Sequence, residues 1–162
     1  MFTGALASSY YGKPRTTTDI DIVVKVAQEE APTGFTPALK RAGLQVNEER
    51  IDAAFKSGFR IASFRDSRSP FTVDIIFSSK ELKKKAGTIL GLPTFYQTPE
   101  ELILSKLRMI KATVPKERAL KDKEDVKAIL RFTKVNMNAI EKEAEKNSTT
   151  SILEKIIGDT SS

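Results

Sequence analysis

The chain has 162 residues, of which 40% are hydrophobic and 30% charged, and its formal net charge is +6. This length corresponds to about one domain with a buried core. Cysteine and histidine are both absent, which excludes disulfides, thiolate metal sites and imidazole bases, so catalysis would have to use carboxylates, lysines and backbone amides.

The positive net charge favours polyanionic partners or phosphate-bearing substrates, although many basic proteins bind no nucleic acid. No apolar run is long enough to cross a bilayer. The "ALAS" stretch at residues 5–8 lacks the basic and apolar regions that precede the cleavage site of a signal peptide. We therefore expect a cytoplasmic protein that makes no contact with a membrane.

Strand and helix signals alternate at the start of the chain. A short apolar strand at residues 1–4 is followed by a helix over residues 5–12, which ends in a glycine. Residues 19–26, "DIDIVVKV", alternate strictly between two kinds of side chain. This pattern predicts a strand with isoleucine and valine on one face, and with Asp19 and Asp21 on the other.

Three further elements are predicted in the first half of the chain. Residues 36–44 predict a short helix that packs on the apolar face of this strand. Residues 58–64 and 71–77 predict an antiparallel hairpin around the turn-rich "RDSRSP". In the second of these strands Asp74 lies opposite the apolar residues, as the two earlier aspartates do.

The second half of the chain contains mainly helix signals. The lysine-rich residues 78–90 predict a basic helix, and residues 92–97 predict a short strand or an extended link. Residues 99–112 predict an amphipathic helix that begins after Thr98 with a capping box. Lys106 falls inside the apolar stripe of this helix.

A further helix over residues 116–134 and a charged helical tail complete the predicted elements. The fold class is therefore α/β, in the mixed α+β sense: a small mixed β-sheet flanked by helices, followed by a helical C-terminal region. We expect a catalytic core over residues 1–96 and a helical region over residues 97–162 that packs on it.

Three carboxylates, those of Asp19, Asp21 and Asp74, are predicted on one sheet face, where they repel one another unless a cation neutralises them. Oxygen ligands without histidine or cysteine suit Mg²⁺ or Mn²⁺. The strand-glycine-helix turn at Gly4 offers backbone N–H groups to a phosphate. A nucleoside triphosphate with magnesium fits both features. In the alternative interpretation the aspartates are only solvated charges at the end of a strand.

The run "TGALASSYYGKPRTTTDIDIVV", followed later by "FTVDII", resembles the nucleotidyltransferase superfamily with the DNA polymerase beta-like catalytic fold. The pattern of that family is a strand ending in Gly-Gly or Gly-Ser, a helix, an Asp-x-Asp strand, and a third acidic residue on a later strand. The resemblance implies that Asp19 and Asp21 bind two metal ions, and that Asp74 holds the catalytic ion and helps to activate the attacking hydroxyl.

The same resemblance implies that Gly4 and Ala5 form the phosphate-binding turn. Ala5 departs from the usual glycine or serine, which removes a hydroxyl contact and leaves the backbone amide.

The resemblance extends to the small nucleotidyltransferase-like proteins of abortive-infection toxin-antitoxin systems. These carry an Arg-x-Ser/Thr-x-Asp run, matched by Arg15, Thr17 and the first aspartate of the pair. They also carry a Lys-Leu helix and a Lys/Arg-Asp-x-x-Asp segment, matched by "SKLRMIK" and "ERALKDKEDV". The resemblance implies that Lys106 neutralises the triphosphate, and that Asp122 and Asp125 orient it or brace the site.

Each of these charged residues also has a structural interpretation. Lys106 can extend from the apolar stripe to solvent. Asp122 and Asp125 can form weak ion pairs with neighbouring basic residues on the helix surface. Arg15 can be a structural counter-ion for the acidic cluster.

These features predict an enzyme that transfers a nucleoside monophosphate from an NTP to a hydroxyl acceptor and releases pyrophosphate. The acceptor is left open between an RNA end, a partner protein and a small molecule. One alternative is a nucleotide-binding or toxin-antitoxin regulatory module with this fold but without catalysis. A second alternative is a nucleotide-sugar glycosyltransferase that uses the "DID" pair, although the chain looks short for that fold and the glycine turn would be unexplained.

The first predicted strand starts almost at Met1, so no preceding helix covers that edge of the sheet. We expect either that the natural start lies further upstream or that another subunit covers this edge. The subunit would be a second copy of the chain or an antitoxin partner.

Overall fold

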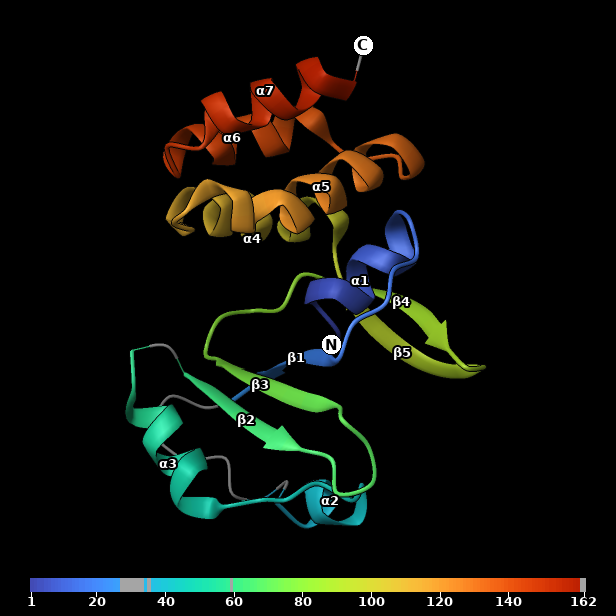
Figure 1. Ribbon diagram of the computed structural model, residues 1–162, viewed down its shortest axis with the longest axis vertical. Helices are drawn as coiled ribbons and strands as arrows, with labels where there is room; N and C mark the ends of the chain where they lie inside the picture. The colour runs from blue at the N-terminus through green and yellow to red at the C-terminus, as the bar shows by residue number, and fades with distance from the viewer. Residues whose placement is uncertain (27–33, 35, 59, 161–162) are drawn as a thin grey trace. The chain divides into compact units, whose positions relative to one another are not determined.

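The computed structural model describes residues 1–26, 34, 36–58 and 60–160. The chain divides into two compact units, the first formed by residues 1–6 and 16–96 and the second by residues 7–15 and 97–162. Helix α1 (Gly4–Tyr11) contributes residues to both units. The structure confirms an α/β fold with small sheets and flanking helices (Figure 1).

The first unit contains a mixed three-stranded sheet in the order β1-β3-β2 (Figure 1). Strand β1 (Asp19–Lys25) pairs in parallel with β3 (Thr72–Ser78), and β2 (Ile61–Arg65) pairs antiparallel with β3. The strand predicted at residues 19–26 and the hairpin predicted from residues 58–64 and 71–77 are therefore confirmed. Because a parallel pair needs a crossover, helices α2 (Thr36–Arg41) and α3 (Glu48–Lys56) lie along the chain between β1 and β3.

One face of this sheet forms the core of the first unit. The alternating residues Phe64, Val73, Ile75 and Phe77 are buried, and the even-numbered residues of β1 pack against them. Helices α2 and α3 contribute Leu39, Ile51 and Ala54 to the same cluster. The two helices thus cover the apolar face, and the odd-numbered residues of β1 lie on the opposite face.

The lysine-rich segment at residues 78–90 is not a basic helix, and that prediction was wrong. Residues Lys84–Ile89 form strand β4, which pairs with β5 (Leu92–Gln97) in a two-stranded sheet. The two turn residues, Leu90 and Gly91, have φ values of 49° and 80°. Two consecutive positive φ angles produce a tight turn whose twist matches that of the flanking strands. The chain therefore reverses at Leu90 and Gly91, and residues 84–89 pair with residues 92–97 as a β-hairpin. The strand predicted at residues 92–97 is confirmed.

Residues 1–3 lie between β1 and β5 instead of forming a full strand. Phe2 bridges antiparallel to Ile22 and in parallel to Tyr96. Its backbone N–H donates to the carbonyl of Phe95 at 2.8 Å, and the N–H of Thr3 donates to the carbonyl of Asp21 at 3.0 Å. Residues 1–3 therefore provide hydrogen-bond partners for the backbone at this edge of β1. A second subunit that covers this edge stays a prediction.

The second unit consists mainly of helices. They are α4 (Pro99–Ala112), the 3₁₀-helix η2 (Lys116–Ala119), α5 (Leu120–Phe132), α6 (Met137–Lys146) and α7 (Thr150–Thr160). Helix α4 begins after Thr98 as predicted, with proline in its first turn, but the Thr98 side chain makes no capping hydrogen bond. The half of the predicted capping box that depends on the Thr98 hydroxyl is therefore not formed.

The core of the second unit is formed by the apolar stripes of its helices. Those buried side chains are Leu102, Ile103, Leu107 and Ile110 of α4, Val126 and Ile129 of α5, Ile140 of α6, and Leu153 and Ile156 of α7. In the described part of the chain, no helix has the length and apolar character that crossing a membrane requires.

We expect Phe64→Ala to lower the free energy of unfolding by about 3 to 5 kcal/mol, because a side chain that is only 1% exposed would leave a cavity under the sheet. Urea denaturation followed by circular dichroism measures this loss. The matched control is Phe71→Ala, whose side chain is 41% exposed and should cost less than half as much. Equal losses for the two variants would contradict the placement of the core.

Candidate functional site

Two of the three predicted aspartates are direct neighbours on adjacent strands. Asp21 of β1 and Asp74 of β3 are Cα partners in the parallel register, and Asp19 pairs with Thr72 one row away. Residues opposite each other on paired strands share a sheet face. All three aspartates therefore lie on the face opposite the core, which we call the carboxylate face.

The chemistry of the carboxylate face fits a hard cation. Among the described residues, Oδ1 of Asp74 is buried and accepts no hydrogen bond. A buried carboxylate oxygen without a donor is costly unless a cation or a proton meets it. Within the described ranges, however, no three acidic side chains lie close enough together to hold one metal ion. Carboxylate oxygens are the ligands that Mg²⁺ and Mn²⁺ prefer, and metal binding by Asp19, Asp21 and Asp74 stays a prediction.

Gly4 lies against the carboxylate of Asp21. Its φ is +58°, and a Cβ added to it would lie 1.9 Å from Oδ2 of Asp21. Both the left-handed backbone and the lack of space therefore require glycine here. Helix α1 begins at this residue, and the next residue, Ala5, is buried. The predicted glycine turn thus lies beside the carboxylate face.

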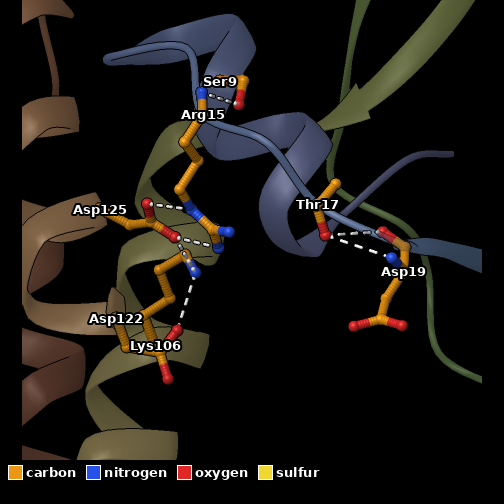
Figure 2. A network of polar contacts seen from close by, with 7 residues as sticks. All are labelled: Ser9, Arg15, Thr17, Asp19, Lys106, Asp122 and Asp125. Atoms are coloured by element: carbon orange, nitrogen blue, oxygen red, sulfur yellow. Dashed lines mark hydrogen bonds and ion pairs between the residues drawn. The ribbon is translucent and has the colours of Figure 1, made fainter. Parts of the chain in front are cut away.

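Thr17 organises the entry into β1. Its Oγ1 accepts a hydrogen bond from the backbone N–H of Asp19 and donates to the carbonyl oxygen of Asp19, both at 3.2 Å (Figure 2). Short side-chain bonds of this kind fix a turn just before a strand. The structure therefore gives Thr17 a local role, and nucleotide binding by Thr17 stays a prediction.

A second polar cluster lies inside the helical unit (Figure 2). Nε and Nη2 of Arg15 donate to the two carboxylate oxygens of Asp125 at 2.9 and 3.0 Å. Nζ of Lys106 lies 2.7 Å from Oδ2 of Asp125 and 2.9 Å from Oδ1 of Asp122. These four side chains form an ion-pair network in which Lys106 and Asp125 are buried and Arg15 and Asp122 are partly exposed. Within the second unit, the network connects Arg15 to helices α4 and α5.

This network corrects three structural interpretations made from the sequence. Lys106 is 5% exposed and does not extend to solvent, because two carboxylates hold its ammonium group inside the unit. Asp122 and Asp125 are ion-pair partners of Lys106, and Asp125 is buried instead of lying on the helix surface. Arg15 binds Asp125 through Nε and Nη2, so the alternative in which Arg15 is a counter-ion of the sheet aspartates was wrong.

The network also determines the ionisation of Asp125. Burial by itself raises the pKa of Asp125, but hydrogen bonds from Arg15 and Lys106 outweigh that effect and hold the pKa below its ordinary value of 3.8. Asp125 is therefore ionised at neutral pH.

Comparisons with known proteins address the fold. The sequence matches no protein-family model and no curated protein. The structure is similar to that of an antigenic nucleotidyltransferase-like protein from Paracoccidioides brasiliensis, with a TM-score of 0.58 over 93% of this chain and 83% of that one. The fold is nucleotidyltransferase-like. Because the two sequences are only 14% identical, this similarity concerns the fold alone. A close relationship to toxin-antitoxin proteins stays a prediction.

Two residues of the carboxylate face were not predicted from the sequence. Ser63 and Arg65 on β2 pair with Asp74 and Thr72, so they lie on the same face as the aspartates. The alternation in "IASFR" indicates which residues share a face, since Ala62 and Phe64 are buried and the residues between and after them are exposed. Without the register against β3, nothing connected these two residues to the acidic pair.

We expect Gly4→Ala to destabilise the protein by at least about 2 kcal/mol, because it forces alanine into a left-handed conformation and drives its Cβ into the Asp21 carboxylate. Thermal and urea unfolding measure the change. Gly58→Ala is the matched control, since a Cβ there meets no atom within 4 Å. A Gly4 variant as stable as the Gly58 variant would contradict the close approach.

We expect Asp125→Asn to lower the free energy of unfolding by about 3 kcal/mol at neutral pH, because it leaves the charges of Lys106 and Arg15 without their carboxylate. The control is Asp159→Asn, which removes an exposed ion pair with Lys127 at 3.6 Å and should cost less than about 1 kcal/mol.

The stability difference between the wild type and Asp125→Asn should also depend on pH. A carboxyl group whose pKa is lower in the folded state stabilises the folded protein fully at any pH above its pKa in the unfolded state. This stabilisation is lost as the pH falls through the pKa of the folded state. The difference should therefore stay constant above pH 3.8 and shrink below it. A constant difference down to the acid unfolding transition would contradict the lowered pKa of Asp125.

Proposed function

We propose that the protein is a metal-dependent nucleotidyltransferase, which moves a nucleoside monophosphate from an NTP to a hydroxyl acceptor and releases pyrophosphate. One observation supports this proposal above the others. In a nucleotidyltransferase-like fold, Asp21 and Asp74 lie side by side on one sheet face, and the glycine turn at Gly4 lies against the first of them.

The carboxylates would hold the metal ion. Asp21 and Asp74, with Asp19 one row away, would bind Mg²⁺ or Mn²⁺, which prefer oxygen ligands. When bound, such an ion supplies Lewis-acid stabilisation of the phosphoryl charge. The backbone at Gly4 and Ala5, where α1 begins, would bind the phosphates through its N–H groups.

In the proposed reaction, the acceptor oxygen forms a bond to the α-phosphorus of the NTP. The bond from that phosphorus to the oxygen bridging to the β-phosphorus breaks, and pyrophosphate leaves with the electron pair. The proton of the acceptor hydroxyl would pass to the carboxylate of Asp74 and then to water. Asp74 would thus orient the acceptor hydroxyl and take its proton.

The helical unit has a supporting place in the proposal. Lys106 and Arg15 are held by carboxylates of their own unit, so we assign them, with Asp122 and Asp125, the role of bracing the helices and the segment that leads into β1. Contact of Lys106, Asp122, Arg15 or Thr17 with a nucleotide stays a prediction.

A nucleotide-binding module without turnover is the second candidate. The observation that favours it is that no three acidic side chains of the described residues are close enough for one metal ion. A protein of this kind would bind an NTP with magnesium and transfer nothing.

The test incubates the full chain with each NTP radiolabelled at the α-phosphate, with magnesium or manganese, total RNA and cell extract. We expect label in an RNA, protein or small-molecule product, and we expect chelation of the metal to abolish it. Asp21→Asn and Asp74→Asn should each lower transfer at least about a hundredfold. Asp52→Asn makes the same chemical change on the exposed surface of α3 and should not affect transfer.

Full transfer by the Asp21 and Asp74 variants, which must remain folded by circular dichroism, would refute the proposal. Metal-dependent NTP binding without transfer by the wild type would support the second candidate instead.

A further inference from the structure

Strand β2 extends the carboxylate face beyond Asp74. Ala62 and Phe64 are buried on the core side of β2, whereas Ser63 and Arg65 are exposed on the other side. Ser63 is the Cα partner of Asp74, which in turn is the partner of Asp21, so these three residues form one row across the sheet. Arg65 belongs to the next row, opposite Thr72.

The positive charge of Arg65 is not neutralised by the described residues. Its guanidinium makes no hydrogen bond or ion pair with them. Lys25, the other basic residue on this sheet face, is bound to Glu81. Arg65 is therefore placed to bind an anion that the described chain does not supply.

Arg65 also lies within reach of the space in front of Asp74. It is one strand away and two residues along the sheet, which corresponds to about 8 Å between Cα atoms, a distance that a long side chain spans. Oδ1 of Asp74 has no donor among the described residues, so the arginine and this oxygen do not neutralise each other. The two groups are suited to ligands of opposite charge: a cation at Asp74 and an anion at Arg65.

The order of elements separates two sides of the acidic pair. Residues 1–3 and the glycine turn adjoin β1, and β2 adjoins β3, so Gly4 and Arg65 lie on opposite sides of Asp21 and Asp74. In phosphoryl transfer the attacking and leaving oxygens are roughly in line with the phosphorus. If the triphosphate lies at the glycine turn, the acceptor approaches from the side of β2.

We propose that Arg65 binds a phosphate group of the acceptor, with the hydroxyl of Ser63 as an additional donor, and that the acceptor is therefore a phosphate-bearing alcohol. This inference rests on the proposed transfer reaction for the direction of approach. A guanidinium binds phosphate with two parallel hydrogen bonds, which gives both affinity and orientation. The chain's net charge of +6 favours the same class of ligand.

The competing interpretation is that Arg65 is a charge that keeps an edge strand from pairing with other chains. An arginine with that role would affect solubility without affecting the affinity for any phosphate. Binding measurements therefore distinguish the two interpretations.

The test measures equilibrium binding to the full chain with two phosphate-bearing probes. One is a short fluorescent single-stranded oligoribonucleotide, and the other is glycerol 3-phosphate, with glycerol as its uncharged counterpart. The variants are Arg65→Gln, Arg65→Lys and the control Arg50→Gln, which removes the same charge from the exposed surface of α3. Nucleotide affinity is measured in parallel with ATP and Ca²⁺.

We expect Arg65→Gln to weaken the binding of at least one phosphate-bearing probe about tenfold, and Arg65→Lys to weaken it less. Arg50→Gln should change that affinity by less than about twofold, and nucleotide affinity should be unchanged in all three variants. A tenfold effect on the oligonucleotide assigns the acceptor to nucleic acids, and an effect on glycerol 3-phosphate alone assigns it to small phosphorylated alcohols.

The proposal is overturned if Arg65→Gln behaves as Arg50→Gln does, if neither probe binds the wild type, or if Arg65→Gln loses nucleotide affinity. Failure of the proposed transfer reaction gives a different result. The protein would then transfer no nucleotide, while the binding of a phosphate-bearing probe would still depend on Arg65.

Discussion

The parallel pairing of β1 with β3 is the interaction on which the rest of the structure depends. Its register places Asp21 opposite Asp74 and, in the same alignment, Ile22 opposite Ile75. A shift of one residue would turn the aspartates of one strand into the core, where each unpaired charge costs several kcal/mol. Hydrophobic burial on one face of the sheet therefore maintains the acidic pair on the other face.

The two units use aspartate in opposite ways. In the helical unit, Asp125 is fully supplied with donors, since Arg15 and Lys106 bind both of its oxygens. In the sheet unit, one oxygen of Asp74 has no donor among the described residues. A fully paired carboxylate stabilises its own fold and has little capacity left for a ligand, whereas a carboxylate that lacks a donor keeps that capacity. This difference separates the bracing residues from the proposed reacting ones.

Local patterns predicted the strands well and the polar contacts poorly. The alternation in "DIDIVVKV" and "FTVDIIF" determined both the strands and the face on which their aspartates lie. The lysines of residues 83–85 suggested a helix, but the tight turn at Leu90 and Gly91 pairs that segment with β5. Leucine rarely adopts a positive φ. A leucine in the sequence therefore does not indicate a turn of this kind.

The remaining features are one local signal that was missed and several contacts between residues far apart in the chain. Helix α3 has a recognisable start, where the Asn47 side chain accepts a hydrogen bond from the backbone N–H of Arg50, and this local cap was not predicted. The bond between Arg15 and Asp125 differs in kind, since the sequence lists their charges and gives no information about their separation in space. The same limit applies to Arg65, whose place on the carboxylate face follows from the strand register alone.

The crossover between β1 and β3 has a consequence for how the protein folds. Because Asp21 and Asp74 belong to parallel strands that α2, α3 and β2 separate along the chain, no hairpin or short fragment brings them together. Contacts between residues far apart in the sequence form slowly, since the entropy cost of closing a large loop comes before the stabilisation by strand pairing. Asp21 and Asp74 therefore become neighbours only when β1 pairs with β3. The rate at which the site forms should equal the rate at which this sheet folds.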